Sequence, residues 1–174
     1  KLKAVIDSVF PLQDAAAAHR RLASRPERLP TPEKPRRVIP GERQVIVVMA
    51  GKGGSGKSVV ATNLALALTF AAGEDAVAIV DADLQFGDVA LLLQMDPVRN
   101  LAEVARQVED LSEARLDALL LRHESGLRVL PAPLQPAAAD TVSPKAVVQV
   151  VERLRRLYRF VVVDTGGILA DTLL

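Results

Sequence analysis

The chain has 174 residues, no cysteine and a formal net charge of +1. This length suits one domain with a substantial core. The lack of cysteine excludes disulfides, cysteine-ligated zinc and iron–sulfur clusters within these residues. The near-neutral charge gives no overall attraction to nucleic acid or anionic lipid, and the few aromatic residues argue against base stacking. The most apolar stretch, residues 59–72, is too short to span a bilayer.

The first part of the chain differs in composition from the rest. Residues 1–22 are interpreted as the tail of a preceding domain, with a short strand at residues 4–10 and a helix at residues 14–22. Residues 23–43 are rich in proline and arginine, which predicts an exposed linker. Solvation of an extended chain explains the basic residues of this linker. A contact with nucleic acid or lipid is the alternative.

From residue 44 onward, strand and helix patterns alternate. The continuous apolar run at residues 45–50 predicts a parallel strand covered on both faces, and residues 59–72 predict a buried helix. A second strand is predicted at residues 76–80. Helices are predicted at residues 100–110 and at residues 112–123, the latter with Ser112 as N-cap. Another helix is predicted from Ser143 to about residue 158, with Pro144 at its first position. The remaining strands are predicted at residues 127–130 and 160–163.

This alternation predicts an α/β fold, a three-layer, doubly wound and mostly parallel sheet with helices on both faces. In such sheets, ligands bind beyond the carboxyl ends of the strands. Three of the predicted strands end at residues suited to phosphate or magnesium chemistry. The sequence therefore predicts a ligand site at this edge of the sheet.

The strongest motif lies directly after the first strand. Residues 51–58 read GKGGSGKS and satisfy G-x-x-x-x-G-K-[ST]. Glycines let backbone N–H groups converge on phosphate oxygens, and the following helix adds the positive end of its dipole. Lys57 is suited to the β- and γ-phosphates and the Ser58 hydroxyl to Mg²⁺. The predicted nucleotide-binding residues are Gly51, Lys52, Gly53, Gly54, Ser55, Gly56, Lys57 and Ser58, and the alternative is a glycine-rich turn without a ligand.

Lys52 is an additional cation in this loop. The motif already has Lys57 for its own phosphates. We therefore expect Lys52 to reach an α- or γ-phosphate across a subunit interface, as an arginine finger does in trans. The alternative is a solvated loop lysine.

Acidic residues follow the second and the last predicted strands. Asp83 is the candidate to orient or deprotonate the attacking water, with Asp81 near the waters of Mg²⁺. The alternative for each is a cap for the segment beginning near Gly87. Asp88 is interpreted as a cap or surface charge. Asp164 is expected to accept from magnesium-bound water, or else to form the turn after its strand.

With its extra lysine, KGGSGKS looks like the deviant Walker A motif of the ParA/MinD ATPases, and the resemblance runs from Gln44 to the end. The segments DADLQFGDVALLLQMDP, RHESGLRVLPAP and VVVD are similar to the CpaE/TadZ subgroup. The resemblance implies that Lys52 acts across an ATP-sandwich homodimer, that Asp83 belongs to switch I and that Asp164 is the Walker B aspartate. It also implies that residues 1–22 are the remnant of a receiver-like domain.

The function implied by the resemblance is slow hydrolysis of ATP with Mg²⁺, carried out by Lys52, Lys57 and Asp83. ATP would favour the dimer and hydrolysis would release it, so that pilus or Tad secretion machinery is positioned. The expected location is the cytoplasm, at the cell pole or the membrane periphery. Two alternatives stay open, a MinD/ParA-type septum-site or DNA-segregation switch that binds membrane or DNA, and a degenerate scaffold without hydrolysis.

Three features depart from the family pattern. Val59, at a nucleotide-binding position, replaces the usual hydroxyl residue and loses a contact to the α-phosphate. Thr165 and Gly166 follow the Walker B aspartate where an apolar residue and proline are usual. The chain stops at Leu174, so we expect the domain to be incomplete at the C-terminus. Iron–sulfur carriers and bacterial tyrosine kinases share this type of loop.

Overall fold

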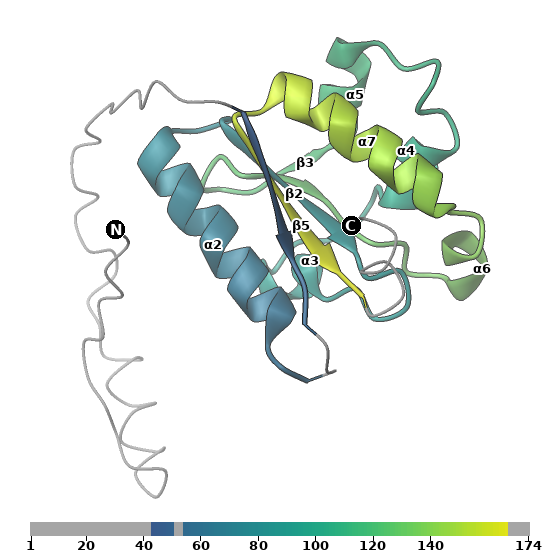
Figure 1. The fold of residues 1–174 in the computed structure, drawn as a ribbon, viewed down its shortest axis with the longest axis horizontal. Coiled ribbons are helices and arrows are strands. Elements are labelled where there is room, and N and C mark those ends of the chain that lie inside the picture. Colours follow the sequence, from purple (N-terminus) through teal and green to yellow (C-terminus); the bar gives the residue numbers. More distant parts are fainter. Residues whose placement is uncertain (1–42, 51–53, 167–174) are drawn as a thin grey trace, which may run out of the picture. The chain divides into compact units, whose positions relative to one another are not determined.

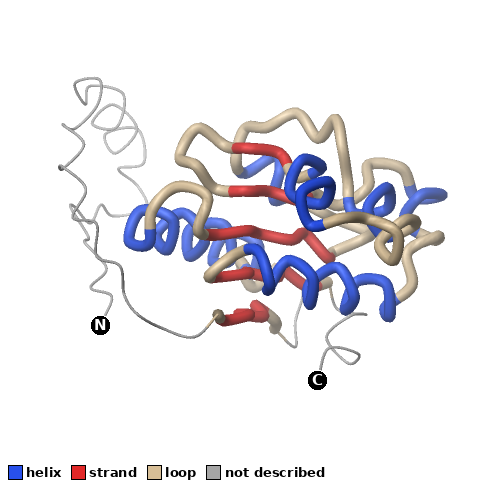
Figure 2. Tube along the Cα trace, turned by 90° about the horizontal axis from the view of Figure 1, so that it is seen from above, coloured by secondary structure: helices blue, strands red, loops and turns tan. Residues whose placement is uncertain are grey.

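The structure is a computed structural model that describes residues 43–50 and 54–166. The described residues form an α/β domain around a five-stranded sheet with the strand order β1-β5-β2-β4-β3. Figure 2 shows the strands lying side by side, with helices along both faces. The interpretations of residues 1–22 and of the linker before Arg43 lie outside the described residues.

The sheet is parallel except at one edge. β1 pairs with β5, β5 with β2 and β2 with β4 in parallel, whereas β3 runs antiparallel to β4. The predicted doubly wound, mostly parallel sheet is thereby confirmed. The strands are β1 (Gln44–Val48), β2 (Val77–Ala82), β3 (Leu121–Arg122), β4 (Arg128–Leu130) and β5 (Phe160–Thr165).

The helices begin mostly at the predicted caps. The Ser112 hydroxyl accepts a hydrogen bond from the N–H of Arg115, and the Ser143 hydroxyl accepts one from Ala146. Both serines therefore satisfy backbone donors that the helix leaves unpaired. The helices are α2 (Lys57–Ala72), α3 (Val89–Leu92), α4 (Leu101–Ala105), α5 (Glu113–Leu119), α6 (Pro136–Ala139) and α7 (Pro144–Leu157).

The prediction of a helix through residue 123 was wrong at its end. α5 stops at Leu119 because Leu120 is extended, with φ −75° and ψ 140°. The next residues form β3 and pair with β4, so this segment gains sheet hydrogen bonds. The sequence did not reveal this switch from helix to strand, because its apolar residues have helical spacing and a two-residue strand is too short to show an alternating pattern.

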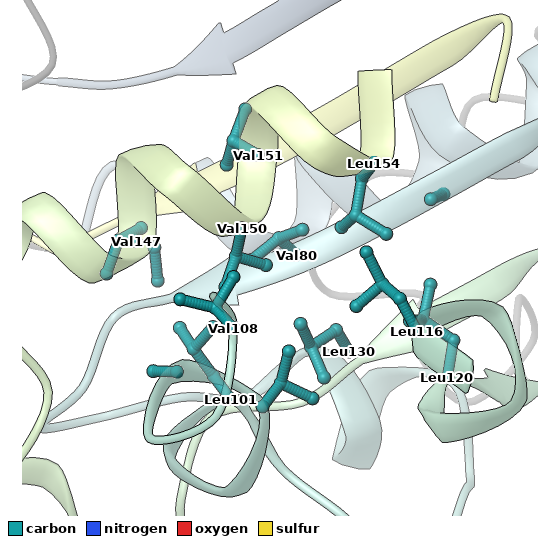
Figure 3. Packing of buried hydrophobic residues seen from close by; sticks show 14 of the residues in the cluster. Val80, Leu101, Val108, Leu116, Leu120, Leu130, Val147, Val150, Val151 and Leu154 are labelled. Atoms are coloured by element: carbon teal, nitrogen blue, oxygen red, sulfur yellow. The ribbon is translucent and has the colours of Figure 1, made fainter. Parts of the chain in front are cut away.

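Side chains alternate between two cores on opposite faces of the sheet. Val77 and Ile79 of β2 pack in the core beneath α2 and α3. Ala78 and Val80 belong to the larger core beneath α4, α5 and α7. Figure 1 shows α2 and α7 on opposite sides of the sheet, and Figure 3 shows α7 side chains pointing toward those of the other elements in the larger core. This two-sided burial explains the continuous apolar runs of the central strands.

α2 differs from its prediction as a buried helix. Its inner face is buried against β5, β2 and β1, but its outer face exposes Val59, Val60 and Phe70. The sequence between Lys57 and Gly73 contains no charged residue, so the pattern gave no sign of a solvent-facing side. No helix in the described residues is both long enough and apolar enough to cross a membrane.

A substitution at Leu154 tests the packing of the larger core. The Leu154 side chain is fully buried, whereas Val148 on the same helix is partly exposed. Leu154→Ala should lower the free energy of unfolding by about 2–5 kcal/mol, because a cavity is left in close-packed surroundings. Val148→Ala should change it by less than about 0.5 kcal/mol. Urea denaturation measures both, and equal effects would contradict this packing.

Candidate nucleotide-binding site

The described part of the phosphate loop links β1 to α2. Gly54 and Gly56 have φ values of 73° and 80°, in the left-handed region that favours glycine. Gly56 is the N-cap of α2 and contributes no side-chain cap, and the first turn contains no acidic residue. The N–H groups of that turn are therefore open to an anionic ligand. Residues 51–53, with the predicted Gly51, Lys52 and Gly53, lie outside the described residues.

Asp164 lies at the centre of the carboxyl edge of the sheet. Its strand, β5, runs between β1 and β2, and Asp164 pairs in register with Val48 on one side and Asp81 on the other. The side chain is fully buried. Among the described residues, neither of its carboxylate oxygens has a hydrogen-bond partner.

The pKa of Asp164 reflects this position. Burial raises the pKa above its usual value, and the Ser58 hydroxyl opposes the rise. The negative charge of Asp83 raises it further, whereas the Lys57 ammonium lowers it. The structure thus brings the predicted Lys57 and Ser58 together with both predicted acidic strand ends.

This arrangement fits a bound magnesium ion. A buried carboxylate without a partner is costly, and a cation offsets that cost. Carboxylate and hydroxyl oxygens are hard ligands of the kind that Mg²⁺ prefers, and the Asp164 carboxylate lies beside the Ser58 hydroxyl. No group of three His, Cys, Asp or Glu residues in the described part of the chain forms a metal site. Most ligands of the ion would therefore come from phosphate and water.

Asp81 has different surroundings. It is 1% exposed, and its two oxygens accept hydrogen bonds from the N–H groups of Asp83 at 3.2 Å and Val89 at 3.0 Å. Burial is the main cause that raises its pKa to about 7, and the nearby Asp164 charge adds to the rise. The Val89 bond caps the start of α3. The geometry therefore favours the capping alternative for Asp81, and its predicted contact with magnesium-bound water stays a prediction.

Asp83 holds the turn that follows β2. Its Oδ1 accepts hydrogen bonds from the N–H of Phe86 at 3.1 Å and of Gln85 at 3.4 Å. A Cβ atom at Gly166 would lie 2.7 Å from the same oxygen, so Asp83 packs directly against the chain after Asp164. Asp88 occupies the N-cap position of α3 but makes no side-chain cap bond, and it is an exposed surface charge.

Two features of the site were missed from the sequence. The Thr165 hydroxyl is buried and donates to the Val48 carbonyl at 3.0 Å, which ties the end of β5 to the end of β1. Gly166 leaves room for the Asp83 carboxylate. Both residues were interpreted only as departures from a family pattern, although a small residue after a strand-ending aspartate signals a close approach.

Comparison with known sequences finds a matching family model and several similar proteins. A family model described as "NUBPL iron-transfer P-loop NTPase" matches residues 41–118. The chain is 37% identical to the antiactivator FleN of Pseudomonas aeruginosa over 132 residues, 74% of the chain and 45% of FleN. It is 54% identical to the iron-sulfur cluster transfer protein NUBPL of Mus musculus over 46 residues, 26% of the chain and 14% of that protein.

Solved structures show the same fold. A ParA family ATPase from Chlorobium tepidum superposes with a TM-score of 0.68 at 25% identity, over 76% of this chain and 57% of the other. MinD of Pyrococcus horikoshii, solved with Mg-ADP, gives 0.60 at 27% identity, over 71% and 49%. The fold is that of the ParA/MinD P-loop NTPases, and the sequence similarities support placing the chain among them. The chain spans about half the length of FleN.

The buried Asp81 predicts a pH-dependent stability. Its pKa is about 7 in the fold and near 3.8 without it, so between these values the folded chain holds a proton that the unfolded chain releases. The stabilisation by the proton on Asp81 is fully present below about pH 3.8 and is lost as pH rises through about 7. The free energy of unfolding should therefore fall over this range in the absence of magnesium and nucleotide.

Asp81→Asn should flatten this pH profile, because it removes the titrating group. Asp88→Asn is the matched control, since Asp88 is an exposed aspartate at the start of α3, close in sequence to Asp81, and it should leave the slope unchanged. Urea denaturation at a series of pH values measures the slope. An Asp81→Asn slope equal to that of the unaltered chain would contradict the assignment.

Proposed function

We propose that this chain binds Mg-ATP at the phosphate loop and hydrolyses it slowly, and that hydrolysis times a dimerisation switch of the CpaE/TadZ kind that positions pilus or Tad secretion machinery. The observation that carries nucleotide binding is the buried Asp164 carboxylate, which has no partner among the described residues and lies beside Ser58 and Lys57. The Mg-ADP found in the similar MinD structure supports the choice of ligand.

Each described residue of the site has a task in this proposal. The backbone amides after Gly54 and Gly56 bind phosphate oxygens, and Lys57 neutralises the β- and γ-phosphates. Ser58 and Asp164 hold the magnesium ion, the latter through its waters. When bound, magnesium neutralises charge that develops on the phosphates during transfer.

Asp83 is the residue proposed to orient the attacking water. The Asp83 carboxylate lies just after β2 and packs against Gly166. It is close enough to Asp164 to raise the pKa of Asp164. Asp81 supports Asp83 by accepting its backbone N–H. A carboxylate fixed in this way can accept a proton from water or hold the water in line.

The dimer and the output rest on sequence features. Lys52 is proposed to reach the nucleotide of a second copy, which makes ATP the ligand that favours the dimer. The segment DLQFGD after β2 supports the CpaE/TadZ subgroup. A MinD/ParA-type switch is the second candidate, favoured by the structural similarity to MinD. Co-sedimentation with liposomes or DNA, with and without ATP, separates the two outputs.

Lys57→Ala tests nucleotide binding. Loss of the ammonium should weaken Mg-ATP binding by about tenfold or more, because charge-assisted contacts to phosphate are among the stronger hydrogen bonds. Isothermal titration calorimetry measures the affinity. Lys145→Ala removes an exposed lysine from α7 and is the matched control. Equal affinities for these two variants would refute the phosphate site.

Asp83→Ala tests the role in hydrolysis. The variant should bind Mg-ATP with near-normal affinity but release phosphate at least about a hundredfold more slowly, as expected when a catalytic acid–base group is removed. A sensitive phosphate-release assay measures the rate. Turnover equal to that of the unaltered chain would show that Asp83 only holds its turn, and absent turnover in both would favour the degenerate scaffold.

A further inference from the structure

The most exposed apolar side chains lie around the ends of β2 and β4. Among the described residues, the large apolar side chains with the highest exposure are Phe86 at 75%, Leu91 at 74%, Leu134 at 73% and Val98 at 68%. Phe86 is one of only five aromatic residues, four Phe and one Tyr, in the whole sequence. Solvation gives no reason for such side chains to gather at one end of the sheet.

Two contacts join the segments that carry three of these side chains. A Cβ atom at Gly87 would lie 2.2 Å from the Cβ of Ala132, so the loop with Phe86 packs against the segment with Leu134. The N–H of Leu101 donates to the carbonyl of Pro131 at 2.8 Å, which brings the chain after Val98 to the same segment. We call Phe86, Val98 and Leu134, with the loops that carry them, the strand-end surface.

The charge around this surface is mainly negative, and Arg99, directly after Val98, is the exception. Residues 83–98 and 131–142 contain aspartates but no lysine or arginine. Asp88, Asp96 and Asp140 are exposed. Acidic groups around an apolar centre repel the phosphates of nucleic acid and of anionic lipid, and they repel the same surface on a second copy. They attract a partner that carries Lys or Arg beside apolar side chains.

We propose that the strand-end surface binds a basic amphipathic segment of a partner protein, with Phe86 and Leu134 as the apolar anchors. Aromatic anchors surrounded by complementary charge are typical of the residues that dominate binding. The acidic groups set the choice of partner and the rate of encounter.

The surface is joined to the proposed nucleotide site by one side chain. The Asp83 carboxylate accepts the N–H of Phe86 at 3.1 Å, and it also packs against Gly166, two residues after Asp164. If Asp83 turns toward a water at the γ-phosphate, the Phe86 backbone loses this bond and its side chain changes position. This link rests on the proposed function, whereas the surface itself does not.

Two synthetic helical peptides provide the probe. Both carry leucine on one face, and the other face carries lysine in the first peptide and glutamate in the second. Fluorescence anisotropy measures their binding to the 174-residue chain. The lysine peptide should bind about tenfold more tightly or better, and equal binding of the two would overturn the proposal.

Substitutions locate the binding. Phe86→Ser and Leu134→Ser should each weaken the lysine peptide by about tenfold, as for anchor residues. Phe70→Ser is the matched control, because Phe70 is 60% exposed on α2, outside the surface. Leu134→Ser carries the test if Phe86→Ser does not fold by circular dichroism. Equal loss in the Phe70 variant would overturn the proposal.

Other occupants are outcomes of the same set of variants. If Phe86→Ser converts a dimer into a monomer in sedimentation, the surface binds a second copy and the proposal is wrong. It is also wrong if the chain pellets with phosphatidylglycerol vesicles and Phe86→Ser abolishes the pelleting. Unchanged sedimentation in both experiments, together with selective loss of the lysine peptide, supports the proposal.

Nucleotide coupling is measured separately. The affinity for the lysine peptide should change by about fivefold or more when Mg-ATP is bound, as is usual for coupled sites. Calorimetry on the same sample shows whether nucleotide binds. Bound nucleotide with unchanged peptide affinity would refute the link through Asp83 and leave the proposed function standing. Peptide binding without nucleotide binding would refute the proposed function and leave the surface standing.

Discussion

The register of β5 between β1 and β2 is the constraint on which this site depends. It sets Asp164 beside Val48, where the chain leaves β1 for the phosphate loop, and beside Asp81 at the end of β2. Two aspartates consequently share the buried centre of the carboxyl edge. Thr165 reinforces the register by donating to the Val48 carbonyl. A slip of one residue would turn Asp164 toward the opposite face of the sheet.

The two buried aspartates are stabilised in different ways. Asp81 accepts two backbone hydrogen bonds, which offset part of the cost of burial and make it a structural element of the turn into α3. Asp164 has no such bonds among the described residues and is neighboured by Ser58 and Lys57. The fold thus provides two backbone donors to the Asp81 carboxylate and, among the described residues, none to that of Asp164. This difference supports the proposal that Asp81 is structural and that Asp164 serves a ligand.

The sequence was most informative where chemistry and local geometry coincide. The phosphate loop, the serine caps of α5 and α7, and the aspartates at two strand ends all follow from residue type and spacing. The role of Asp81 does not, since its partner Val89 is eight residues away and the bond depends on how the turn closes. β3 was missed because its pairing comes from β4 and not from a pattern of its own. The exposure of Phe70 was hidden because α2 carries no charge after Lys57 to mark a solvent-facing side.

The similarities to known proteins differ in how much of the chain they cover. Similarity to NUBPL spans 46 residues at 54% identity, whereas similarity to FleN spans 132 residues at 37%. The family model matches residues 41–118, which include the GKGGSGKS motif. Such a motif recurs among proteins that bind the same phosphate groups, because its glycines and lysine serve one kind of ligand. Proteins that share this fold need not bind the same partner, so the fold alone does not identify the partner. We propose that in this chain the choice is made outside the phosphate loop, on segments whose large apolar side chains face solvent and whose charges are mainly acidic. The fold and the phosphate loop therefore support the class of protein, whereas the strand-end surface is where we propose that this chain selects its partner.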